Sequence, residues 1–166
     1  LQIAFPAGHD VARAVNGISF TVARGESVCL VGESGCGKSL TALSLLRLVP
    51  PPGRIEAGSQ ILFDGADILT LDDERLRDIR GQHMAMIFQE PMTALNPVLT
   101  VGDQIAEVLR VHTALSRQET WTRTVDMLAQ VGIADAGARA KQYPHELSGG
   151  MRQRVMIAMA LIMSPK

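Results

Sequence analysis

The stretch from Gly32 to Ser39 constrains the fold of this chain more than any other feature. It reads Gly-Glu-Ser-Gly-Cys-Gly-Lys-Ser and fits the pattern G-x-x-x-x-G-K-[ST]. The residues before it, 27–31, are apolar and β-branched at their centre, which predicts a short buried strand. The residues after it, 40–49, carry apolar side chains three positions apart and predict a helix. A glycine-rich loop between a buried strand and a helix favours an α/β fold.

The residue types of this loop are those that bind a polyphosphate. Gly35 and Gly37 have no Cβ, so the backbone can approach a phosphate closely, and the helix start adds partial positive charge. Lys38 can bridge two phosphates, and Ser39 offers a hydroxyl to Mg²⁺. A glycine-rich turn that matches by chance is the alternative, and the flanking strand and helix disfavour it. The predicted nucleotide-binding residues here are Ser34, Gly35, Cys36, Gly37, Lys38, Ser39, Leu40 and Thr41.

Composition narrows the class of protein. A length of 166 residues suggests one domain, or one domain with an inserted subdomain, and 46% hydrophobic residues can build a core. The net charge of -1 argues against a nucleic-acid partner bound by bulk electrostatics. Cys29 and Cys36 are expected to be reduced thiols in a cytosolic protein. Because the chain begins at Leu1 and stops after a helix at Lys166, both ends are expected to be cut.

The remaining pattern alternates between strands, turns and helices. Apolar or alternating segments predict an edge strand at 1–5 and further strands at 18–22, 60–63 and 84–88, the last one buried and parallel. Turns are predicted at 7–10 and at Asp64-Gly65, and the prolines from Pro50 are expected to end the first helix. A charged surface helix is predicted at 72–80, with Thr70 or Asp72 as its cap.

After Gln89 the sequence pattern predicts mainly helices. Helices are predicted at 101–112, after Thr100, and at 117–131, after the capping box of Ser116 and Glu119. The predicted domains are therefore an α/β core at 1–89, a helical subdomain at 90–146, and a last motif with its helix at 147–166.

That last motif, 147–154, reads Leu-Ser-Gly-Gly-Met-Arg-Gln-Arg and precedes a helix predicted at 151–163. Ser148 can cap this helix, and Gly149 and Gly150 leave its first N–H groups uncovered. The motif thus predicts a second anion site, although an ordinary helix cap would have the same residues.

Taken together, these motifs resemble those of the ATP-binding cassette (ABC) ATPases. The motif at 147–154 is similar to the family signature L-S-G-G-Q-x-Q-R, with Met151 in place of glutamine. The glycine-rich loop corresponds to the Walker A motif, and Gln89 to the glutamine of the Q-loop. Segments 85–97 and 143–154 are similar to those of the peptide and nickel importer ATPases. The implied fold is a P-loop NTPase of the ABC type, α/β with an antiparallel β edge and an inserted helical subdomain, C-terminally truncated.

The resemblance also implies roles for single residues. Lys38 and Gln89 would be catalytic, and Ser39 and Gln89 would contact Mg²⁺. Phe5 is the candidate for stacking on adenine, or else a core residue of the edge strand. Ser148, Gly149 and Gly150 would bind the γ-phosphate of ATP that a second subunit holds. Because Leu40 replaces a frequent threonine, a role of Thr41 at the α-phosphate is left open.

By the same resemblance, the chain is an ATP-binding subunit that couples ATP hydrolysis to import of an oligopeptide, dipeptide or nickel complex. It would work at the cytoplasmic face of the plasma membrane, as a peripheral protein. Its partners would be a second ATP-binding subunit in a head-to-tail dimer, transmembrane permease subunits and, indirectly, an extracytoplasmic solute-binding protein. Part of the apolar run at 91–99 is expected at the surface beside a permease, and a charge at Leu95 is expected to uncouple transport while leaving ATP binding intact.

Two other classes of protein share the glycine-rich loop. A soluble ABC ATPase of DNA repair or chromosome maintenance would carry a coiled coil or a zinc site in the helical insert, which here is short and lacks cysteine. A P-loop kinase or GTPase would lack the Ser-Gly-Gly helix start. The family's Walker B carboxylates and switch histidine have no counterpart in this sequence, so poor hydrolysis is expected.

Overall fold

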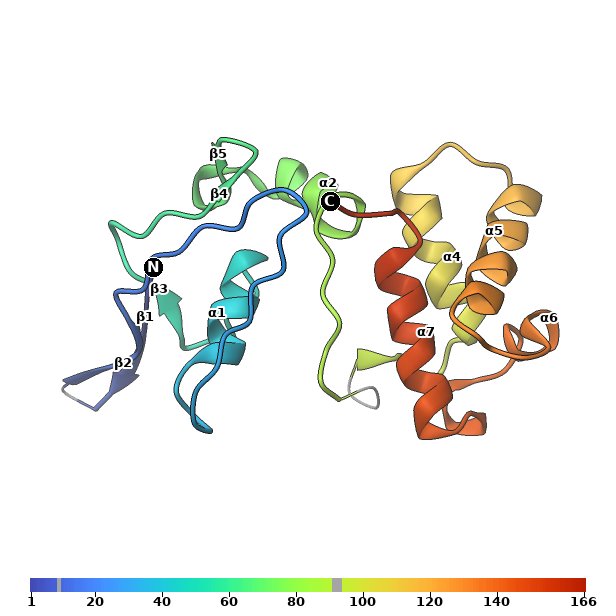
Figure 1. Cartoon of the computed structure of the whole chain (residues 1–166), viewed down its shortest axis with the longest axis horizontal. Coiled ribbons are helices and arrows are strands. Elements are labelled where there is room, and N and C mark those ends of the chain that lie inside the picture. The colour runs from blue at the N-terminus through green and yellow to red at the C-terminus, as the bar shows by residue number, and fades with distance from the viewer. Residues whose placement is uncertain (9, 91–93) are drawn as a thin grey trace. The chain divides into compact units, whose positions relative to one another are not determined.

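The computed structural model describes residues 1–8, 10–90 and 94–166 of the chain, and it divides them into two compact units (Figure 1). The first unit comprises residues 1–76 and the second residues 77–166. In the described parts of the chain, none of the helices combines the length and the apolar character that a membrane span requires.

A small antiparallel sheet forms one layer of the first unit. Its strands are β1 (Gln2–Ala7), β2 (Asp10–Asn16) and β3 (Arg54–Ile55), in the order β2-β1-β3. Ile3 and Ala4 of β1 are fully buried. The predicted edge strand at 1–5 is therefore the central strand of this sheet, which is a correction. Gly8 has the positive φ expected of a turn, whereas His9 of the predicted turn lies outside the described residues.

Helix α1 (Lys38–Leu45) follows the glycine-rich loop and is shorter than predicted. It begins two residues before 40 and ends well before Pro50, because Arg47 takes a left-handed conformation with φ of 51°. The Arg47 guanidinium donates to the carbonyl of Leu71 at 2.7 Å, and this bond holds the chain in the conformation that ends the helix. The prediction that the prolines end the helix was wrong.

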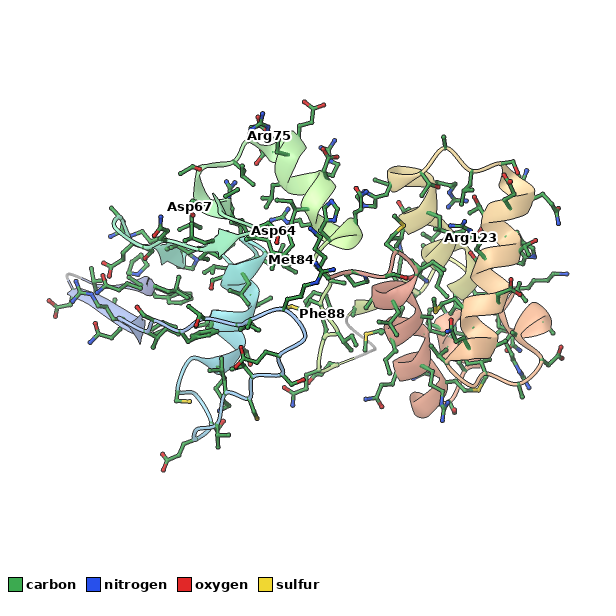
Figure 2. The ribbon with its side chains drawn as sticks, turned by 45° about the horizontal axis from the view of Figure 1, so that its top comes forward. Asp64, Asp67, Arg75, Met84, Phe88 and Arg123 are labelled. Atoms are coloured by element: carbon green, nitrogen blue, oxygen red, sulfur yellow. The ribbon has the colours of Figure 1, made fainter. Side chains whose placement is uncertain are left out.

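A hairpin and a second helix follow. Strands β4 (Leu62–Phe63) and β5 (Ala66–Asp67) are joined by Asp64 and Gly65, both at positive φ, which confirms the predicted turn (Figure 2). The short 3-10 helix η1 spans Ile68–Thr70. Helix α2 runs over Asp73–Gln82, and the carboxylate of Asp72 accepts the N–H of Arg75 at 2.8 Å. Asp72 is therefore the cap.

Three predicted strands do not form. Segments 18–22 and 27–31 are assigned to no strand, and 84–88 has a single bridge, between Met84 and Arg80. Their apolar side chains are open to solvent: Val31 is 89% exposed and Phe88 is 43% exposed. Figure 2 shows Met84 and Phe88 on an irregular stretch of chain. A buried strand needs neighbours on both sides, and no strand among the described residues pairs with these segments.

The second unit is a group of packed helices, and here the sequence predicted well. The elements are α4 (Val101–His112), α5 (Arg117–Gln130), α6 (Ala136–Arg139), η2 (Pro144–Glu146) and α7 (Gly149–Leu161). The predicted helices at 101–112 and 117–131 are confirmed, and α7 begins two residues earlier than predicted.

Both predicted caps of these helices are also present. The hydroxyl of Thr100 accepts the N–H of Asp103 at 3.1 Å, and Ser116 forms the complete capping box with Glu119. The Ser116 hydroxyl and its backbone N–H donate to the Glu119 carboxylate at 2.6 and 2.8 Å. These hydrogen bonds, the hydroxyl's first, hold the pKa of Glu119 below its ordinary value.

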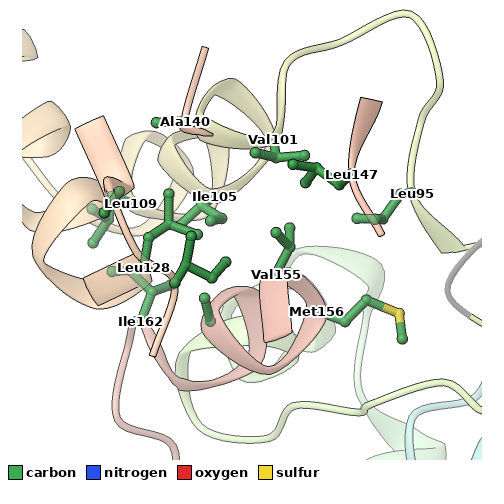
Figure 3. Packing of buried hydrophobic residues seen from close by; sticks show 13 residues of the cluster. Leu95, Val101, Ile105, Leu109, Leu128, Ala140, Leu147, Val155, Met156 and Ile162 are labelled. Carbon is green, nitrogen blue, oxygen red and sulfur yellow. The ribbon is translucent and has the colours of Figure 1, made fainter. Parts of the chain in front are cut away.

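Apolar side chains from α4, α5 and α7 meet in one core (Figure 3). Its fully buried members include Ile105, Leu109, Leu128 and Val155. Leu95 joins them with only 4% of its surface exposed. The expectation that Leu95 faces a membrane partner is therefore wrong. The exposed apolar residues of that run are instead Pro97, Val98 (74% exposed) and Leu99 (38% exposed), while 91–93 lie outside the described residues.

We expect Leu95→Ala to lower the free energy of unfolding by about 2–4 kcal/mol, because it opens a cavity in this core. Val98→Ala is the matched control, since a mostly exposed side chain should change that energy by less than about 0.5 kcal/mol. Urea denaturation followed by circular dichroism measures both. Equal effects in the two variants would contradict the packing of Leu95.

Candidate functional site

The glycine-rich loop is held together by the side chain that follows it. The ammonium of Lys38 donates to the carbonyl oxygens of Gly32 and Glu33, each at 2.7 Å, and lies 3.5 Å from the Cys36 Sγ. The Cys36 N–H donates to the Glu33 carbonyl at 3.4 Å. Lys38 thus closes the loop on itself through its bonds to these two carbonyl groups.

Gly37 fixes where this loop meets the sheet. Its φ is 92°, and a Cβ at this position would lie 2.5 Å from the carbonyl oxygen of Ala14 and 3.0 Å from Val15 Cγ2. The contact with the Ala14 oxygen is shorter than a Cβ tolerates, and the contact with Val15 would require that side chain to shift. Only glycine lets the loop approach β2 this closely while taking a left-handed backbone conformation. The start of α1 is therefore positioned by the sheet.

The first turn of α1 presents free backbone donors. Among the residues that the structure describes, no side chain caps this helix, and its first internal hydrogen bond runs from the N–H of Thr41 to the carbonyl of Gly37, at 2.8 Å. The N–H groups of Lys38, Ser39 and Leu40 precede that bond and have no helical partner. Ser39 is exposed at this turn. The arrangement fits an anion at the helix start.

Thr41 differs from its neighbours because it is buried. Only 3% of its surface is exposed, and its hydroxyl donates to the Gly37 carbonyl at 3.0 Å. Its hydroxyl is thus engaged within the helix. By contrast, Ser34, Gly35 and Cys36 are exposed in the turn. Cys29 and Cys36 are both free thiols, as predicted.

Phe5 lies on β1 and is half-buried. Its ring packs closely over Gly53, where an added Cβ would lie 2.5 Å from Phe5 Cζ. Part of the Phe5 ring therefore packs against the backbone of the first unit.

The motif at 147–154 opens α7 in the second unit. The hydroxyl of Ser148 accepts the N–H of Met151 at 3.4 Å, which confirms the predicted cap. Gly149 and Gly150 are exposed, with open space where a side chain would stand. Leu147 is buried in the helical core and anchors the motif. Gln89 is exposed in the same unit.

Two features of these sites were not predicted from the sequence. One is the contact between Gly37 and β2, since residues 10–16 carry no clear strand pattern. The other is the bond from Thr41 to Gly37. The sequence did contain a signal for this bond, because a threonine in a helix often donates its hydroxyl to the carbonyl four residues back, and Gly37 lies four residues before Thr41.

The comparison with known families agrees with these observations. A sequence model of the ABC transporter family matches residues 15–166. The chain belongs to the ABC transporter family.

The chain is similar to several curated ATP-binding proteins of peptide transport. It is 49% identical over 165 residues to a dipeptide transport ATP-binding protein of Bacillus subtilis, covering 99% of the chain and 49% of the relative. It is 46% identical to an oligopeptide transport ATP-binding protein of the same organism. That match covers 100% of the chain and 46% of the relative. A peptidoglycan transport ATP-binding protein of Agrobacterium fabrum is 53% identical, and the match covers 100% of the chain and 30% of that relative. The chain therefore spans half or less of these relatives.

A solved structure shares the fold. The ATP-binding cassette MJ0796, in a dimeric post-hydrolysis state bound to ADP and Pi, superposes with a TM-score of 0.85 at 27% identity, over 99% of this chain and 68% of that one. The predicted fold, an α/β cassette of the ABC type with antiparallel strands and a helical subdomain, is thereby confirmed. The backbone keeps the course of a cassette even where its predicted strands stay unpaired.

We expect Gly37→Ala to destabilise the first unit more than Gly35→Ala. Gly35 also has a positive φ, of 82°, but none of the described residues lies within 4 Å of an added Cβ, so Gly35→Ala should cost only the backbone strain of about 1–2 kcal/mol. At Gly37 the clash with Ala14 should add about 1–3 kcal/mol. Amide hydrogen exchange of β1 and β2 measures the difference. Equal loss of protection in both variants would contradict the role of this contact.

Proposed function

We propose that this chain is the nucleotide-binding part of a peptide importer's ATP-binding subunit, and that ATP occupies the loop between Gly32 and Ser39. The observation that carries the proposal is the uncapped start of α1 next to the Lys38 cation, in a chain of the ABC transporter family. The transported solute would be an oligopeptide, a dipeptide or a nickel complex. The names of the peptide-transport relatives support this class of solute over a role in DNA repair.

ATP would replace the loop's internal contacts with contacts to phosphate. The Lys38 ammonium, which now satisfies two carbonyl groups, would turn to the β- and γ-phosphates. The N–H groups of residues 35–39 would surround the β-phosphate, with the α1 start favouring its charge. Ser34 and Leu40 flank this cradle. Thr41 would support it from inside the helix, because its buried hydroxyl is bonded to Gly37.

The exposed hydroxyl of Ser39 suits a magnesium site, because Mg²⁺ prefers oxygen ligands and retains several waters. When bound, the ion would neutralise part of the phosphate charge. Gln89 is proposed as the second contact to this ion or to the attacking water. Phe5 is proposed as the adenine platform, through the part of its ring that Gly53 does not cover.

The exposed helix start at Ser148, Gly149 and Gly150 is proposed to bind the γ-phosphate of ATP held by a second subunit, in a head-to-tail dimer. The dimeric, nucleotide-bound state of the similar cassette MJ0796 supports such an assembly. Permease subunits would contact the second unit at the exposed Val98 and Leu99, at the cytoplasmic face of the membrane. A solute-binding protein outside the membrane would act on this chain only through the permease.

We expect Lys38→Ala to weaken binding of Mg-ATP by about 1.5–3 kcal/mol, the contribution of a charge-assisted contact. Isothermal titration calorimetry measures this change. Lys141→Ala, which removes the same charge from the second unit, is the control and should leave the affinity unaltered. If the Lys38 variant binds as tightly as the unaltered chain, the nucleotide site lies elsewhere.

A separate prediction concerns turnover. Hydrolysis requires a positioned general base, whose loss typically costs about 10²–10⁴-fold. The sequence offers no Walker B carboxylate after a buried strand, so we expect these 166 residues to release phosphate slowly. The measurement is steady-state phosphate release beside a chimera that adds the remaining residues of the dipeptide transport relative. Equal rates in the two would place the base within the present chain.

A further inference from the structure

The second unit contains a cavity that the proposed nucleotide chemistry does not use. It has a volume of about 550 Å³ and lies between the start of α4, the start of α5 and the segment around Lys141. Its lining includes the charged residues Asp103, Arg110, Arg117 and Lys141, together with Thr120 and Trp121. This volume is within the range of small-molecule sites, which run from about 300 to 1,000 Å³.

The backbone of the unit builds this cavity. The N–H groups of Val101 and Gly102 donate to the carbonyl oxygens of Gln142 and Ala140, at 2.9 and 2.8 Å. These bonds fix Lys141 beside the first turn of α4. Gly102 also allows the Trp121 ring to approach, since an added Cβ would lie 2.9 Å from Trp121 Cζ3. The indole therefore forms a fixed wall.

The charge of the lining is positive. Arg110, Arg117 and Lys141 contribute three cations against the single carboxylate of Asp103. Asp103 is already engaged, because its carboxylate accepts the hydroxyl of Thr100 at 2.7 Å. Arg110 is held in place by donating to the backbone carbonyl of Asp103 at 3.1 Å. The cavity thus favours an anion.

Thr120 provides an independent sign of a ligand. It lines the cavity with only 3% of its surface exposed, and its hydroxyl oxygen has no hydrogen-bond partner among the described residues. Buried polar groups nearly always have a partner, and leaving one without costs free energy. The equivalent hydroxyl one turn later, on Thr124, donates to the Thr120 carbonyl at 2.8 Å.

We propose that this cavity binds a small organic anion, with its carboxylate or phosphate at Arg110, Arg117 and Lys141. A polar atom of the ligand bonds the hydroxyl of Thr120, and its carbon skeleton lies against the indole of Trp121. The site is confined to the second unit and is separate from the phosphate loop.

The test uses Trp121, which is the chain's single tryptophan, as a fluorescent reporter. Citrate and glycerol 3-phosphate are titrated into the full chain at physiological salt, one as a carboxylate and one as a phosphate probe. We expect a saturable change with at least one of them, and the stronger probe identifies the anionic group. Lys38→Ala should keep this signal, so failure of the nucleotide site and failure of this cavity are distinguishable.

Charge variants test the cation cluster. Arg117→Gln combined with Lys141→Gln should raise the dissociation constant at least about tenfold, because two charge-assisted contacts are lost. Arg123→Gln is the control, since Arg123 is exposed on α5 (Figure 2) and does not line the cavity; it should leave the constant within about twofold.

Thr120→Val tests the hydroxyl with almost no change of shape. It should raise the dissociation constant several-fold while keeping or raising the Tm of the free chain, since a buried unpartnered hydroxyl is removed. Thr124→Val should lower the Tm, because it breaks an existing hydrogen bond. The proposal is overturned if neither probe gives saturation or if the double charge variant binds normally.

Discussion

The close approach of Gly37 to the carbonyl of Ala14 is the contact on which the phosphate loop depends. It joins the loop to strand β2, whose Val15 is buried opposite Ile3 of the neighbouring strand β1. Because the contact sets the left-handed φ of Gly37, it also sets the direction in which α1 begins. The free N–H groups of the first turn and the Lys38 cation take their positions from it.

Backbone pairing explains where the cassette departs from the predicted α/β sheet. Segments 27–31 and 84–88 have the composition of buried strands, but a strand exists only when its N–H and C=O groups find a neighbour. The described residues supply none, so Val31 and Phe88 stay exposed. The chain nevertheless follows the course of a solved cassette, and it spans about half the length of its dipeptide transport relative.

The helical unit depends much less on distant partners. Three of its helices begin at a cap, Thr100, Ser116 or Ser148, whose hydroxyl accepts the N–H of the residue three positions later. Its core is closed by apolar residues of α4, α5 and α7, with Leu95 included. This unit can hold a preformed cavity because the backbone bonds between α4 and the segment 140–142 do not require a ligand.

Several local features could be predicted from the sequence alone. The glycine-rich loop, the caps, the turn at Asp64 and Gly65, and the family signature all depend on residues a few positions apart, and they were predicted correctly. Tertiary structure decided what depends on distant neighbours. Segment 84–88 becomes a strand only if another strand pairs with it. The burial of Leu95 depends on how α4 and α7 pack, and the end of α1 depends on the hydrogen bond from Arg47 to Leu71. The cavity belongs to the same group, because Arg110, Thr120 and Lys141 lie apart in the sequence and meet only through helix packing.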